Sequence, residues 1–264
     1  MCTCNKQWTY WLTTSLIIIV ALAWLTGCAS TKQSSRLAPL GKTVKDAGFL
    51  GDLYPLMREG KGDEALRLYR NPKFESPAAF AQYTKVLLDP VVIYAGPDSK
   101  LPETPQAERE TIAKAFYAQI YDKLSKDYEM VTEPGPNTLR VQVAIVDAEE
   151  SNPYIEAISY LPMPVGVPGV KAGLVLLKTT ATGKPPFAGE VTVEGKFNDA
   201  QTGEVIAAAV DRRVGARKPI IGIFQGATYD SWNDVDEAMR YWAERLRYRL
   251  CQRRGGTDCV VPKA

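Results

Sequence analysis

The chain has 264 residues, a formal net charge of +2 and no histidine. With 32 basic and 30 acidic side chains in near balance, there is no electrostatic reason to expect a nucleic-acid partner. The absence of histidine excludes Ser-His-Asp and Cys-His catalysis and histidine-bearing metal centres. We therefore expect a protein that is not an enzyme and has no catalytic residue, no metal and no cofactor.

The N-terminal 27 residues have the pattern of a secretory signal peptide. Lys6 is the one positive charge, and an apolar run over 16–24 follows it, too short to span as a membrane helix. The next four residues, Leu25-Thr26-Gly27-Cys28, resemble the bacterial lipobox, which implies cleavage before Cys28 and attachment of acyl chains, palmitate among them, to that cysteine. The alternative is an uncleaved N-terminal helix.

An acylated Cys28 predicts a stable membrane anchor, because two or more acyl chains hold a protein firmly at a bilayer. Ala29 stands where Asp typically retains such proteins at the inner membrane, so we expect the periplasmic face of the outer membrane. Residues 28–48 are predicted to be a flexible tether, 49–252 a single domain and 253–264 a C-terminal tail.

Two cysteines remain after cleavage, Cys251 and Cys259. In an oxidising compartment their spacing favours a disulfide, and the alternative is a pair of unpaired thiols. A zinc site is disfavoured, because two cysteines without histidine fall short of a zinc ligand set.

The first half of the domain contains three expected elements. Asp63 is placed to cap a short helix over 63–70, which Asn71-Pro72 would end. A strand is expected over 91–94, directly after a proline. Thr104-Pro105 is typical of a helix start, with Thr104 as the N-cap and Pro105 as the first helical residue. A helix to about residue 127 follows from one apolar stripe: Ile112, Phe116, Ile120 and Leu124.

The second half is predicted to be mostly β-structure. A short strand over 128–132 precedes a strand over 139–145, whose apolar and polar residues alternate with a period of two. Residues 189–213 predict a β-hairpin with its turn at 198–203. A final helix is expected over 232–252 from a second apolar stripe that includes Trp242, which should be buried.

This order, β-α-β-β-(insert)-β-β-α, predicts an α+β domain in which two helices pack on one face of a mostly antiparallel sheet. Several motifs resemble the bacterial lipoprotein family known as domain of unknown function 3313, in this order along the chain: Gly48-Phe49-Leu50, Leu88-Asp89-Pro90-Val91, Glu133-Pro134-Gly135-Pro136, Leu139-Arg140-Val141, Thr202-Gly203-Glu204 and Asp211-Arg212-Arg213. The resemblance implies a periplasmic lipoprotein and brings no catalytic residues with it.

Two apolar segments are candidate contact surfaces. Residues 161–177 combine apolar side chains with proline and glycine, and 220–224 is an apolar run between turn formers. Either segment can instead pack within the domain. The candidate contact residues are Met163, Val165, Val167, Ile220, Ile221, Ile223 and Phe224.

The final helix carries arginines off its apolar stripe. They could meet anionic headgroups, or they could form a solvated face that complements the helix C-terminus. These residues are Arg240, Arg245, Arg247, Arg249, Arg253 and Arg254.

Two functions follow from these features. The leading hypothesis is a membrane-anchored, non-enzymatic binding or scaffolding module for an envelope protein. The alternative is a carrier of a small apolar ligand or lipid, whose pocket the two apolar segments would line.

Overall fold

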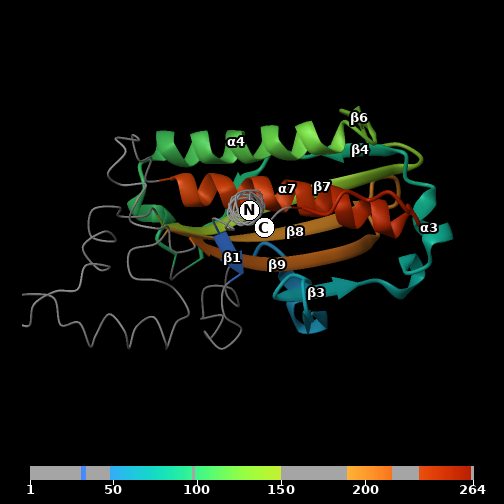
Figure 1. Ribbon diagram of the computed structural model, residues 1–264, viewed down its shortest axis with the longest axis horizontal. Coiled ribbons are helices and arrows are strands. Elements are labelled where there is room, and N and C mark those ends of the chain that lie inside the picture. The colour runs from blue at the N-terminus through green and yellow to red at the C-terminus, as the bar shows by residue number, and fades with distance from the viewer. Residues whose placement is uncertain (1–30, 34–47, 97–98, 150–188, 216–231, 263–264) are drawn as a thin grey trace, which may run out of the picture.

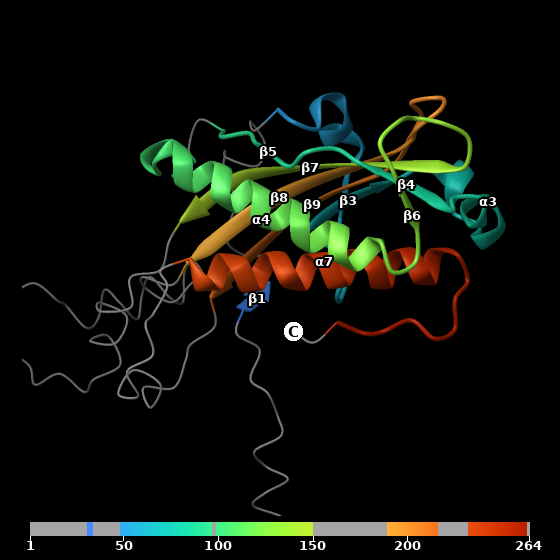
Figure 2. The same cartoon turned by 90° about the horizontal axis from the view of Figure 1, so that it is seen from above.

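The structure is a computed structural model that describes residues 31–33, 48–96, 99–149, 189–215 and 232–262. In these residues one mixed sheet is covered on one face by two long helices that lie side by side (Figures 1 and 2). The predicted α+β class, with two helices over a mostly antiparallel sheet, is confirmed.

Three long antiparallel strands form the centre of the sheet: β7 (Thr138–Glu149), β8 (Glu190–Asp199) and β9 (Val205–Gly215). β8 and β9 form the predicted hairpin. Its turn places Gly203 at φ +76°, a conformation that favours glycine, while an oxygen of Asp199 accepts hydrogen bonds from the backbone N–H groups of Gln201 and Thr202.

Shorter strands extend the sheet on both sides. On the β9 side lie β3 (Arg67–Arg70), which pairs in turn with β2 (Arg58–Glu59), and β1 (Thr31–Gln33), all antiparallel. On the β7 side β4 (Lys85–Leu88) and β5 (Val92–Ile93) run parallel to β7, and β6 (Glu129–Val131) runs parallel to β4.

The helices α4 (Gln106–Leu124) and α7 (Asn233–Arg253) pack against each other and against the sheet. Every residue of the α4 stripe predicted from sequence is buried, and Trp242 of α7 is 9 % exposed. Alternate residues of β7 and β8, such as Val141, Ile145 and Val191, complete this core. Short helical segments also lie between the longer elements of the described residues: η1 (Gly51–Leu56), η2 (Pro72–Phe74), α3 (Pro77–Ala81) and η3 (Leu101–Glu103).

The opposite face of the sheet carries a smaller cluster, in which Leu50 and Tyr54 pack against Ala208 and Val210. The fully buried Glu194 lies in the same region, and the Tyr54 hydroxyl lies 2.8 Å from each of its carboxylate oxygens. Burial is the main cause that raises the pKa of Glu194 to about 7.

Several local predictions are wrong. Residues 67–70 form β3 and not the end of a helix over 63–70, because Leu66 and Leu68 are buried at alternate positions and β3 pairs with β9 along its whole length. Pro105, and not Thr104, occupies the N-cap of α4, and no side chain caps that helix.

Two further differences concern strands. Residues 31–33 lie in the expected tether but form β1, which is hydrogen-bonded to β9. The predicted strand over 91–94 is present as the shorter β5, and β4 precedes it on the other side of Pro90, where no strand was expected.

Candidate functional site

Most residues predicted to contact a partner lie outside the described part of the chain. This applies to the lipid attachment residue and to both apolar segments. The site residues concerned are Cys28, Met163, Val165, Val167, Ile220, Ile221, Ile223 and Phe224. Within the described ranges, no helix is long and apolar enough to cross a membrane.

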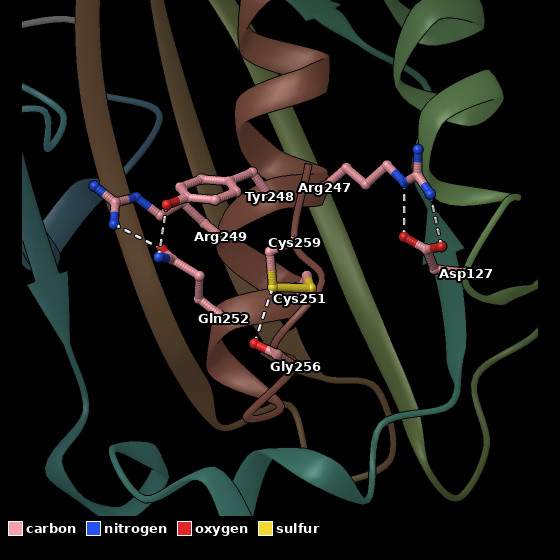
Figure 3. Close-up of a disulfide and its surroundings, with 8 residues drawn as sticks. All are labelled: Asp127, Arg247, Tyr248, Arg249, Cys251, Gln252, Gly256 and Cys259. Atoms are coloured by element: carbon pink, nitrogen blue, oxygen red, sulfur yellow. Dashed lines mark hydrogen bonds and ion pairs between the residues drawn. A yellow bond between two sulfur atoms is a disulfide. The ribbon is translucent and has the colours of Figure 1, made fainter. Parts of the chain in front are cut away.

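The two C-terminal cysteines are described, and a disulfide joins them (Figure 3). The Cα atoms of Cys251 and Cys259 are 5.7 Å apart, inside the usual range for this bond. A Cβ atom on Gly256 would lie 2.7 Å from the Cys251 Sγ, so the turn between the cysteines requires a residue without a side chain. The bond fastens the end of the chain to the last turn of α7.

The arginines of α7 leave the helix on different sides, as Figure 3 shows for Arg247 and Arg249. Arg247 donates two hydrogen bonds of 2.7 and 2.9 Å to Asp127, just beyond the end of α4, and lowers the pKa of that carboxyl group. Arg254 lies over the Tyr128 ring, and Arg240 lies 3.6 Å from Glu244. These three arginines have structural partners and do not form a common site.

The other three, Arg245, Arg249 and Arg253, lie at the rim of a cavity of about 400 Å³ beneath α7. Its roof is the apolar side of α7, including Trp242, Leu246 and Leu250. Its floor is formed by β8 and β9, and its inner end reaches Phe116 and Ile120 of α4. The volume lies within the range of small-molecule binding pockets.

Small side chains in register produce the hollow in the floor. Gly195 of β8 lies directly opposite Ala209 of β9, and the next pair on the same face is Phe197 and Ala207. A Cβ atom on Gly195 would lie 3.6 Å from the Phe197 ring, an ordinary van der Waals distance, so a small side chain would fit there without displacing a neighbour. The sheet thus leaves unfilled volume where helix and sheet would otherwise touch.

The segment between β2 and β3 closes one side of the cavity. Asp63 forms ion pairs with both Arg245 and Arg249, the second at 2.7 Å. Glu64 bonds to Arg58 and Arg70 at 2.9 and 2.8 Å, and the hydrogen bond from Arg58 is the largest of the causes that lower the pKa of Glu64 to about 2. Both carboxylates stay ionised at neutral pH, which keeps this wall in place.

A buried polar cluster forms the other end of the cavity. Asp211 accepts hydrogen bonds from the Trp242 Nε1 at 2.7 Å, the Gln33 Nε2 at 2.6 Å and the Leu66 N–H at 3.2 Å. Burial raises the pKa of Asp211. The Arg213 guanidinium lies 3.7 Å above the Tyr241 ring. These groups satisfy one another, so this end of the cavity is structural.

The arrangement offers a hollow lined mainly by apolar side chains, with cations at one mouth. No group of three or more potential metal-ligating side chains occurs in the described residues. Sequence reasoning missed the cavity because its signal, the run Ala207-Ala208-Ala209 opposite Gly195, has meaning only once the register of β8 and β9 is known.

Comparison with solved structures finds low-scoring similarities. The PelC dodecamer from Paraburkholderia phytofirmans is 11% identical, covers 73% of this chain and 97% of its own, and has a TM-score of 0.34. A Caulobacter crescentus CB15 protein provisionally described as a lipoprotein is 10% identical, with coverage of 69% and 96% and a TM-score of 0.30. A Helicobacter pylori protein provisionally described as a homologue of the neuraminyllactose-binding hemagglutinin is 10% identical, with coverage of 66% and 88% and a TM-score of 0.32.

TM-scores below 0.5 are too low for these similarities to bear on fold or function. No curated protein matches the chain significantly. The family described as protein of unknown function (DUF3313) matches residues 45–246, most of the chain. This match confirms the resemblance seen in the sequence motifs, and the chain belongs to the DUF3313 family.

Proposed function

We propose that the protein is a lipid-anchored envelope lipoprotein whose domain is a non-enzymatic binding module for a small apolar ligand. The lipobox that ends in Cys28 supports the anchor, and Ala29 favours the periplasmic face of the outer membrane. In this proposal the cavity beneath α7 is the binding site.

The cavity is the observation that carries the proposal. Single domains seldom leave space of this size between helix and sheet, because interiors are packed as densely as organic crystals. Here the sheet side of the cavity contains the small paired residues Gly195 and Ala209, and Trp242 and Leu246 line the helix side with apolar atoms. Removing a ligand's apolar surface from water would supply the binding free energy, about 25 cal/mol per Å².

The second function predicted from sequence, scaffolding of an envelope protein, depends on residues 161–177 and 220–224. Both segments lie outside the described residues, so no observation on their packing favours it. The cavity favours the ligand carrier instead.

A dye titration tests the proposal. The protein is the mature chain, residues 28–264 with Cys28→Ser, which contains every described element and has no acyl chain of its own to compete. The probe is N-phenyl-1-naphthylamine, a neutral apolar dye that fluoresces when it leaves water. We expect saturable binding near one dye per protein.

Two variants make the test specific to the cavity. Ala209→Leu fills the hollow beside Gly195 and should weaken dye binding at least about tenfold. Ala118→Leu makes the same change on the exposed side of α4 and should leave binding unchanged. Absence of saturable binding to the parent chain, or equal binding to Ala209→Leu with a native melting curve, would refute the proposal.

A further inference from the structure

We infer that the ligand is an anionic amphiphile with a single acyl chain, held with its chain in the cavity and its carboxylate or phosphate head at the arginine rim. The inference rests on the proposed function and names its ligand class. The arginine rim is defined here as Arg70, Arg245, Arg249 and Arg253, which all line the same cavity.

The rim places like charges on one side of one helix. Arg245, Arg249 and Arg253 are spaced at i, i+4 and i+8, so they lie one above another along α7. Like charges at this spacing disfavour the helix. Arg70 adds a fourth positive charge from the sheet, because it pairs in register with Ala207 of the cavity floor. A C-terminal position explains a cation at Arg253, but it does not explain cations two turns earlier.

The acidic side chains at the rim do not balance these charges. Asp63 pairs with Arg245 and Arg249, and Glu64 pairs with Arg70. The charge of Glu75 also acts on Arg253. These three carboxylates face four guanidinium groups, so the mouth of the cavity keeps an excess of positive charge. An anion at this mouth would be attracted both by charge and by the available N–H donors.

Arg253 is the member of the rim best placed to hold the anion. Among the described residues no carboxylate lies within ion-pair distance of Arg253, and its Nη1 donates one long hydrogen bond, of 3.5 Å, to the Glu75 carbonyl. Burial, followed by the charge of Arg70, lowers the pKa of Arg253. A guanidinium has five N–H donors in a planar fork that suits a carboxylate or phosphate, and the described residues engage one of those on Arg253, through the Glu75 carbonyl.

The cavity continues from this mouth as an apolar channel. From Arg253 to Trp242 the helix rises about 16 Å, at roughly 1.5 Å per residue, and Leu246 and Leu250 lie along the way. At about 30 Å³ per methylene-sized group, 400 Å³ holds roughly a dozen such groups. A twelve-carbon chain with its head at Arg253 therefore matches the cavity in length and volume.

Titration of three probes that share a twelve-carbon chain tests this inference. Dodecanoate, dodecyl phosphate and dodecan-1-ol are each titrated, below their aggregation limits, into residues 28–264 carrying Cys28→Ser. The Trp242 fluorescence reports binding, with Trp232→Phe removing the other tryptophan of the mature chain. We expect at least one of the two anions to bind at least about tenfold more tightly than the alcohol, and the preferred anion indicates whether fatty acids or phosphate-bearing lipids are the source.

Variants assign the preference to the rim. Arg253→Gln should weaken binding of the anion about tenfold and leave the alcohol unchanged, whereas Arg240→Gln, a matched change on the exposed side of α7, should alter neither. Equal affinity for the alcohol and both anions, or an anion preference that survives Arg253→Gln, would overturn the inference while the proposed apolar carrier still stands. If none of the three probes and no apolar dye binds, the proposed function fails as well.

Discussion

Glu194 makes the stability of the domain depend on pH in a direction opposite to that of most carboxylates. Its side chain is fully buried, and its one described hydrogen-bond donor is the Tyr54 hydroxyl. With burial opposed by the Tyr54 hydrogen bond and by the charge of Arg67, the pKa of Glu194 in the folded state is about 7, against 4.5 for the free side chain.

The sign and the size of the effect follow from proton linkage. Below pH 4.5 the group is protonated in both the folded and the unfolded protein, so it adds no pH dependence. Between pH 4.5 and about 7 the unfolded chain loses this proton first, and the free energy of unfolding falls as pH rises. The total loss for a shift of this size is about 3 kcal/mol, at roughly 1.4 kcal/mol per pKa unit.

Glu194→Gln removes the charge and keeps an oxygen that can accept the Tyr54 hydrogen bond. The variant should match the parent chain near pH 4.5 and exceed it by about 3 kcal/mol at pH 8. Urea denaturation of both proteins at several pH values, followed by tryptophan fluorescence, measures this difference. Contributions of other buried acids such as Asp211 are common to both proteins and cancel. A difference that stays constant from pH 4.5 to 8 would refute the assignment of this pKa.

Three other changes have expected outcomes. Cys28→Ser should leave an unprocessed precursor that no longer partitions with lipoproteins into detergent, and wild-type processing of the variant would contradict the proposed anchor. Trp242→Ala should lower the free energy of unfolding by about 3–5 kcal/mol, since it removes a buried ring and a hydrogen bond to Asp211; a loss under 1 kcal/mol in urea denaturation would contradict this. Replacing Cys251 and Cys259 by serine should lower the free energy of unfolding by about 2.5 kcal/mol in the same assay, because the disulfide closes a short loop in the unfolded chain. Free alkylation of both thiols in the native protein would show that the bond is absent.

Elements with a strong period were predictable from the sequence. The stripe of α4, the alternation of β7 and the turn chemistry of the β8–β9 hairpin each repeat over several residues, and each predicted the right element. The helix predicted over 63–70 depends on one capping residue, Asp63, whereas Leu66 and Leu68 alternate with polar residues and are both buried in the structure.

The cavity and its rim depend on contacts between distant parts of the chain. Arg70 and Arg253 are 183 positions apart in sequence, and only the pairing of β3 with β9 beneath α7 brings them to one mouth. The register that sets Gly195 opposite Ala209 is likewise a property of the folded sheet. Periodicity along one segment contains none of this information.

Quenching of Trp242 by a brominated ligand tests the central claim, that the space beneath α7 binds an apolar chain, most directly. The protein is again residues 28–264 with Cys28→Ser and Trp232→Phe, and the ligand is 12-bromododecanoate, whose bromine quenches tryptophan only at close contact. With the carboxylate at Arg253, the bromine should reach Trp242, so we predict saturable quenching of its fluorescence. Ala209→Leu should raise the ligand concentration needed for half-maximal quenching at least about tenfold. Binding of the same ligand without quenching of Trp242, or quenching that Ala209→Leu leaves unchanged, would contradict a site in this cavity.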